Sequence, residues 1–139
     1  MIASPNARLQ ACWKPETPVY IAAQKGRVDA IHMLAKLGAD VNTPDINDMT
    51  PVWIAAQEGH VDAIHVLKAL GADVNTPDIN DMTPVWIAAK NGRVDTIRVL
   101  AELGADINTP SNTGCTPVCI AAQNGHKDAK RVIEELGAT

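Results

Sequence analysis

The chain contains no phenylalanine, and its only aromatic residues are three tryptophans and one tyrosine. Its apolar core must therefore be built from Ala, Val, Ile and Leu. Uninterrupted apolar runs reach about five residues, as at 52–56. A helix needs ~20 consecutive apolar residues to cross a bilayer, so we expect no membrane-spanning segment.

Cysteine is scarce as well, and Cys12, Cys115 and Cys119 make an odd number. No secretory leader, basic and then apolar, precedes them, so a disulfide scaffold is not expected. A reducing setting inside the cell, the cytoplasm, fits this composition.

Neither sign of charge dominates the chain. Twelve basic residues against 16 acidic ones give a formal net charge of -4. This balance argues against a nucleic-acid partner or an anionic membrane surface, both of which select for clustered positive charge.

Signatures of catalysis and metal binding are missing too. The sequence has no glycine-rich phosphate loop and no Gly-x-Ser-x-Gly turn. His60 and His65 are five residues apart, which is not a zinc-helix spacing, so we interpret the histidines as solvent-edge or capping residues. Cys115 and Cys119 have no second pair to complete four ligands. We predict no enzyme, no cofactor and no metal site.

What the chain does have is a repeat. The heptapeptide Thr-Pro-Val-Trp-Ile-Ala-Ala at 50–56 recurs in near-copies at 17–23, 83–89 and 116–122, each 33 residues from the next. The units 45–77 and 78–110 agree at 25 of 33 positions. Such a period indicates that one supersecondary unit has been copied about four times.

The unit 45–77 predicts two helices after a turn. Thr50 is placed to cap an inner helix, and Pro51 suits its first position, where no N–H is needed. Gly59 and Gly71 are suited to end the inner helix and an outer helix over 61–70. The outer helix is apolar over more than half of its circumference, so it needs neighbours on two sides and the units must stack.

The period, the heptapeptide, Gly59-His60 and the closing Gly-Ala-Asp-Val-Asn at 71–75 resemble the ankyrin repeat family. The resemblance implies an all-α solenoid of stacked helix-turn-helix units with β-turn fingers. It covers 12–139 as repeats 1 to 4 (12–44, 45–77, 78–110 and 111–139), after an irregular leader or partial cap at 1–11. In repeat 4, Lys127 and Lys130 replace the apolar residues of repeat 2, which predicts a polar C-terminal cap.

Two features depart from the family pattern. Where the family commonly has a histidine that ties neighbouring turns together, this chain has Tyr20, Trp53, Trp86 and Cys119. This puts the network between turns in doubt, and a stacked aromatic ladder from Tyr20 through Trp53 to Trp86 is the replacement that we expect, in preference to a ligand site.

The second departure concerns a turn glycine, which only Gly114 keeps. Asp48 and Asp81 are expected to adopt its left-handed conformation, whereas Pro15 cannot.

The resemblance places the binding surface on the concave side, on the fingertips and the inner-helix edge. The implied fingertip residues are Trp13, Lys14, Glu16, Ile46, Asn47, Met49, Ile79, Asn80, Met82, Asn112, Thr113 and Cys115. The implied helix-edge residues are Gln24, Lys25, Gln57, Glu58, Lys90, Asn91, Gln123 and Asn124. Exposed Ile and Met at fingertips suggest a contact patch. Alternatively, Ile46 and Ile79 pack against neighbouring fingers.

The leading hypothesis is a non-catalytic, monomeric module that binds an unknown protein partner. One alternative is a structural spacer array, natural or engineered, without a partner. Another follows from the resemblance: Asn42, Asn75 and Asn108 look like sites modified by asparaginyl hydroxylases. Ordinary turn chemistry explains the same asparagines.

Overall fold

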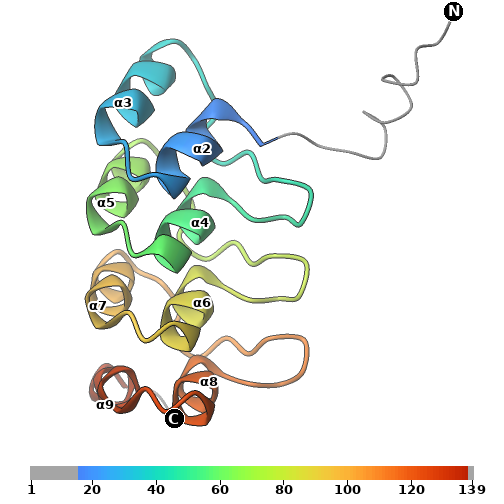
Figure 1. Cartoon of the computed structure of the whole chain (residues 1–139), viewed down its shortest axis with the longest axis vertical. Helices are drawn as coiled ribbons and strands as arrows, with labels where there is room; N and C mark the ends of the chain where they lie inside the picture. Colours follow the sequence, from blue (N-terminus) through green and yellow to red (C-terminus); the bar gives the residue numbers. More distant parts are fainter. Residues whose placement is uncertain (1–15, 138–139) are drawn as a thin grey trace, which may run out of the picture.

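The computed structural model describes residues 16–137, which form eight helices and no strand. The inner helices are α2 (Pro18–Gln24), α4 (Pro51–Glu58), α6 (Pro84–Lys90) and α8 (Pro117–Gln123). The outer helices are α3 (Val28–Lys36), α5 (Val61–Ala69), α7 (Val94–Glu102) and α9 (Lys127–Glu135). Each inner helix pairs with the outer helix that follows it, and the four pairs are piled in chain order along one line (Figure 1). The expected all-α stack is confirmed.

Every inner helix begins in the way that the sequence predicts. The hydroxyl groups of Thr17, Thr50, Thr83 and Thr116 accept a hydrogen bond from the amide three residues later, at 3.1 to 3.3 Å. A proline follows each threonine at the first helical position. Gly59 ends α4 in the left-handed conformation at φ 77°. These local signals fix where each repeat places its inner helix.

The core lies between successive pairs as well as within each pair. Ala23, Ala56 and Ala89, one in each of the first three inner helices, are fully buried. Small side chains at these positions let neighbouring inner helices approach closely, and α2, α4, α6 and α8 contact one another in series. On the outer layer, Ile64 and Ile97 are also fully buried. No pair could bury these residues by itself.

The fourth helix pair differs from the earlier pairs in the burial of its residues. Lys127 and Lys130 of α9 are exposed, as a polar C-terminal face requires. On α8, however, Ala122 is exposed and Val118 is half-buried, although the corresponding residues in earlier repeats are buried. The polar substitution is therefore confined to the outer helix.

Several predictions fall on residues that the structure does not describe. The leader at 1–11, Cys12 and the departure at Pro15 lie outside residues 16–137. Within that range, no helix has the length and apolar character that a membrane crossing requires.

Candidate functional site

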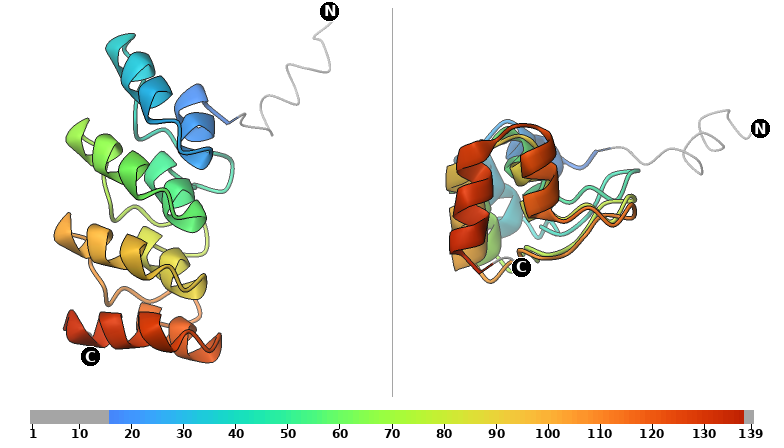
Figure 2. Two further views of the ribbon diagram at one scale, coloured as in Figure 1. Left: turned by 60° about the vertical axis from the view of Figure 1, so that its left-hand side comes forward. Right: turned by 90° about the horizontal axis from the view of Figure 1, so that it is seen from below.

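Three turns project from the same side of the stack, beside the inner helices (Figure 2). We call them finger 2 (45–50), finger 3 (78–83) and finger 4 (111–116). In finger 2, the Asp45 carboxylate accepts the amides of Asn47 and Met49 at 2.8 and 2.9 Å. Asp78 makes the same bonds in finger 3. These buried carboxylates hold each turn from within.

The fingertips adopt the backbone conformation expected of them. Asp48 and Asp81 have φ angles of 62° and 61°, and Gly114 has 83° at the corresponding position. Aspartate tolerates the left-handed region better than most residues because its short polar side chain can bond locally. The two aspartates therefore replace the family's glycine, and their carboxylates remain exposed.

Hydrogen bonds tie each finger to the next, contrary to the doubt raised by the missing histidines. The indole N–H of Trp53 donates to the Met82 carbonyl oxygen at 2.8 Å. Trp86 donates in the same way to the Cys115 carbonyl oxygen at 2.8 Å. The doubt about the network between turns was therefore wrong at Trp53 and Trp86. A tryptophan can only donate a hydrogen bond, and a donor is sufficient here because the indole faces a carbonyl oxygen of the next finger.

The three aromatic residues are buried, with exposed fractions of 2% for Tyr20 and Trp53 and 4% for Trp86. Tyr20 contacts the next finger through its hydroxyl, which lies 3.9 Å from the Met49 sulfur and also interacts with the Asp45 carboxylate. The fingertips are also joined directly by backbone bonds. The Ile79 amide donates to Asn47 at 2.9 Å, and the Asn112 amide donates to Asn80 at 3.0 Å.

The structure separates the predicted fingertip contacts into two groups. Ile46 is 48% exposed and Ile79 is 61% exposed, so neither is covered by a neighbouring finger. Met49, Met82 and Cys115 are half-buried and pack against the core. The other predicted fingertip residues in the described range are exposed: Glu16, Asn47, Asn80, Asn112 and Thr113. Trp13 and Lys14 lie outside that range.

The predicted helix-edge residues are exposed or half-buried, but some of their groups are already bonded within the stack. The exposed ones are Lys25, Glu58, Lys90, Asn91, Gln123 and Asn124, and Gln24 and Gln57 are half-buried. The Asn91 amide donates to the Gln57 carbonyl at 3.3 Å, and the Asn124 amide donates to the Lys90 carbonyl at 3.0 Å.

Sequence reasoning missed the residues that strengthen these ties. Arg93 Nε donates to the Gln57 carbonyl at 2.7 Å, and His60 Nε2 lies 3.0 Å from the Gln24 carbonyl oxygen. The His60 ring also lies against Gly26 of the preceding repeat. The signal that could have found them is positional, because both residues directly follow a glycine that ends an inner-helix segment.

The candidate modification sites lie in the loops that close the repeats. The Asn42 side-chain oxygen accepts the Asp73 amide at 2.9 Å, and that of Asn75 accepts the Asp106 amide at 2.8 Å. The amides of Asn42, Asn75 and Asn108 each donate to the aspartate two residues earlier, at 2.8 to 2.9 Å. These asparagines are exposed, and their hydrogen bonds stabilise the loop turns, as the turn-chemistry explanation predicts.

Two ionisable groups on the finger side have shifted pKa values. Burial raises the pKa of Tyr20 well above its usual range, and the carboxylates of Asp45, Glu16 and Glu58 add to the effect. Burial and the adjacent Cys119 raise the pKa of Cys115 to about 11. Both groups therefore remain neutral near pH 7.

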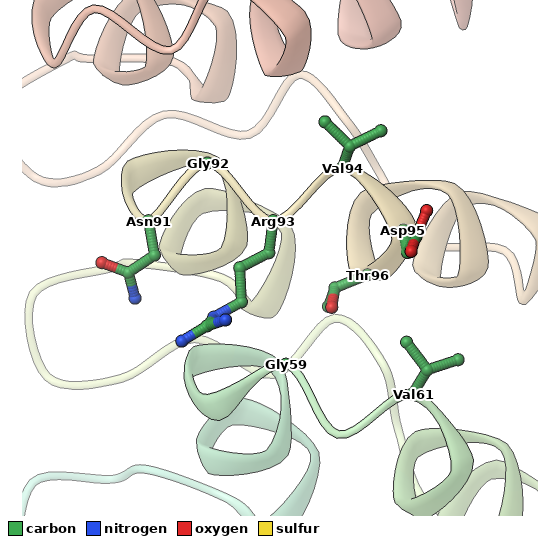
Figure 3. Close-up of a pocket in the computed structure, with 8 residues that line it drawn as sticks. All are labelled: Gly59, Val61, Asn91, Gly92, Arg93, Val94, Asp95 and Thr96. Carbon is green, nitrogen blue, oxygen red and sulfur yellow. The ribbon is translucent and has the colours of Figure 1, made fainter.

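Open pockets lie where the turns between inner and outer helices stack. The one in Figure 3 has a volume of about 280 Å³ and lies between the turns of repeats 2 and 3. Its lining residues are Gly59, Val61, Asn91, Gly92, Arg93, Val94, Asp95 and Thr96. Similar pockets of about 290 and 400 Å³ lie at the other two junctions. We attribute the recurrence of these pockets to the stacking of equivalent turns. In the described part of the chain, no three His, Cys, Asp or Glu side chains lie close enough together to hold a metal ion.

Comparison with known proteins agrees with this geometry. The family model described as "Ankyrin repeats (3 copies)" matches residues 1–78 and 66–138, which together cover nearly the whole chain. No curated protein matches the sequence. The four stacked helix pairs, the threonine-capped inner helices and the projecting fingers are the structural counterpart of that match. The chain belongs to the ankyrin repeat family.

Proposed function

We propose that this chain is a non-catalytic protein-interaction module that binds a partner protein through fingers 2 to 4 and the exposed edge of the inner helices. Ankyrin repeat domains are generally used for protein interaction. The observation that carries the proposal is the exposure of Ile46 and Ile79 on fingers that are hydrogen-bonded to their neighbours. Because the fingers are held before binding, little conformational entropy is lost when a partner docks.

The inner-helix edge supplies the polar rim of this surface. Gln123 is exposed, while Asn91 and Asn124 direct one amide hydrogen each to a backbone carbonyl and keep their remaining polar atoms available. Amides beside exposed aliphatic side chains are a common composition for a protein contact, in which apolar anchors give affinity and polar groups give register.

The experiment is affinity capture with the intact chain, followed by crosslink mapping and by variants of the exposed isoleucines. Ile46→Asp combined with Ile79→Asp is expected to abolish capture of the crosslinked partner while the protein stays folded by circular dichroism. Met33→Asp is the matched control, because Met33 of α3 is 61% exposed, like Ile79, but lies on the outer layer. Crosslinks confined to the outer helices would show that the proposed surface is wrong.

The two alternatives keep tests of their own. A spacer array would enrich nothing above background in the same capture. Substrate behaviour toward an asparaginyl hydroxylase would appear as the mass of one added oxygen on Asn42, Asn75 or Asn108 in protein isolated from cells. The exposure of these asparagines supports that alternative, and their turn hydrogen bonds support the structural reading.

A further inference from the structure

Two adjacent fingers have the same hexapeptide sequence, Asp-Ile-Asn-Asp-Met-Thr, of which the central Ile-Asn-Asp is exposed. Each contributes an exposed aliphatic side chain, Ile46 or Ile79, and a half-buried methionine beside it, Met49 or Met82. Finger 4 breaks the pattern, since Asn112 stands in the place of the isoleucine. The apolar part of the surface is therefore a pair of like contacts, one repeat apart.

Charge on the same fingers has one sign only. Fingers 2, 3 and 4 contain no Lys, Arg or His. Asp48 and Asp81 place exposed carboxylates at the tips, two residues after each isoleucine, and the buried carboxylates of Asp45 and Asp78 lie beneath. Finger 4 has Gly114 where the exposed aspartate would be. The negative charge and the aliphatic contacts thus coincide on fingers 2 and 3.

The charges just outside the fingers are of both signs. Glu16 is exposed before α2, and Glu58 ends α4 in the position that Lys25 holds in repeat 1; both carboxylates raise the pKa of Tyr20. The cationic side chains on the inner helices of the described range are Lys25 and Lys90, which stand at or just beyond the helix C-termini rather than on the fingers. A partner that approaches the fingertips therefore meets net negative charge.

The distance between the two fingers limits which secondary structure of a partner can contact both isoleucines. Packed helices lie about 8–10 Å apart, so corresponding points on successive repeats are separated by about that distance. Residues seven apart on an α-helix are about 10.5 Å apart on nearly the same face. In an extended strand the matching separation of about 10 Å is three residues, which places the two side chains on opposite faces.

We propose that fingers 2 and 3 bind a basic amphipathic helix of a partner protein. Its two aliphatic side chains, seven residues apart, contact Ile46 and Ile79, and Lys or Arg residues beside them pair with Asp48 and Asp81. This inference rests on the proposed function, and it adds the chemistry and conformation of the partner segment. Neutral finger 4 lies beyond this helix contact and remains available to other parts of the partner.

The test is selection of a displayed library of helical peptides against the full-length chain, with the surface positions of the peptides randomised. We expect the selected peptides to carry net positive charge and an aliphatic pair seven residues apart. Ile46→Asp with Ile79→Asp should weaken their binding at least tenfold. Asp48→Asn with Asp81→Asn should weaken it at least fivefold, because asparagine keeps the left-handed backbone and removes only the charge.

Met33→Lys on α3, an exposed position on the outer layer away from the fingers, is the matched control and should change affinity less than twofold. Circular dichroism and unfolding in urea will show that all variants fold. Selected peptides that are neutral or acidic, that keep their affinity for the Asp48→Asn and Asp81→Asn variant, or that bind equally after proline interruption would overturn the inference. An unenriched library would overturn it as well.

Failure of the basic-helix proposal can be distinguished from failure of the proposed function. A cellular partner that crosslinks to fingers 2 and 3 through an acidic or extended segment would contradict the basic helix and leave the interaction surface intact. A second copy of this chain as the only bound species, seen by sedimentation, would contradict the basic helix of a separate partner. Crosslinks restricted to the outer helices would remove both proposals.

Discussion

The tryptophan ties between fingers should make a measurable contribution to stability, and Trp53→Phe tests it. The substitution removes the indole N–H that donates to the Met82 carbonyl at 2.8 Å. The Met82 carbonyl also accepts the Asp78 amide at 2.9 Å, so it keeps one partner and the loss is the net contribution of one hydrogen bond, about 0.5–1.5 kcal/mol. The smaller ring also gives up roughly 40 Å² of buried apolar surface, about 1 kcal/mol. We therefore expect the free energy of unfolding to fall by about 1.5–2.5 kcal/mol.

The assay is urea unfolding followed by circular dichroism, with the slope of the transition compared between variants so that a change in midpoint reports stability alone. Ile54→Val is the packing control, because Ile54 lies beside Trp53 in α4, is 3% exposed and would lose one methylene for about 0.5–1.5 kcal/mol. If Trp53→Phe costs no more than Ile54→Val, the indole bond contributes nothing and the reasoning fails.

Three further predictions concern the stack. Ile64→Ala should lower the free energy of unfolding by about 2–5 kcal/mol, while Lys130→Ala at the corresponding position should change it by less than about 0.5 kcal/mol in the same assay; equal effects would contradict stacking. The raised pKa of Cys115, about 11 instead of 9.0, leaves about a hundredfold fewer thiolates at pH 8, so alkylation of this residue by iodoacetamide, followed by mass spectrometry, should be correspondingly slower than in the unfolded chain. Gly26→Ala should lower the melting temperature, because φ is +68° and an added Cβ would lie 2.7 Å from the His60 ring; an unchanged melting temperature would contradict both the backbone strain and the close contact.

The course of the backbone could be predicted because the decisive signals are local. The Thr-Pro pair that opens each heptapeptide, such as Thr50 and Pro51, starts an inner helix, and the glycines that end the helix segments have positive φ. The exposed state of Lys130 followed from the same reasoning, since an unpaired ammonium group is costly to bury. Because the unit recurs every 33 residues, the helices predicted for one repeat were predicted for all four.

The site could be predicted only in part because side-chain direction is a property of the assembled stack. Nothing in the sequence near Trp53 shows that its indole faces a carbonyl 29 residues later. Asn91 and Asn124 have the composition of contact residues, yet each also supports the preceding repeat. Met49 and Met82 were expected at the surface together with the isoleucines, but their longer side chains turn toward the core.

The indole bonds give the array a direction. Each finger is anchored by the aromatic residue of the repeat before it and never by its own, so positional order passes from the amino-terminal end toward the carboxyl-terminal end. Finger 2 receives the long contact from the Tyr20 hydroxyl to sulfur and an interaction of the same hydroxyl with Asp45, whereas fingers 3 and 4 each receive a short bond to a backbone oxygen. Because the Ile79 amide also bonds to the Asn47 carbonyl, a ligand that spans fingers 2 and 3 rests on two supports that are coupled to each other.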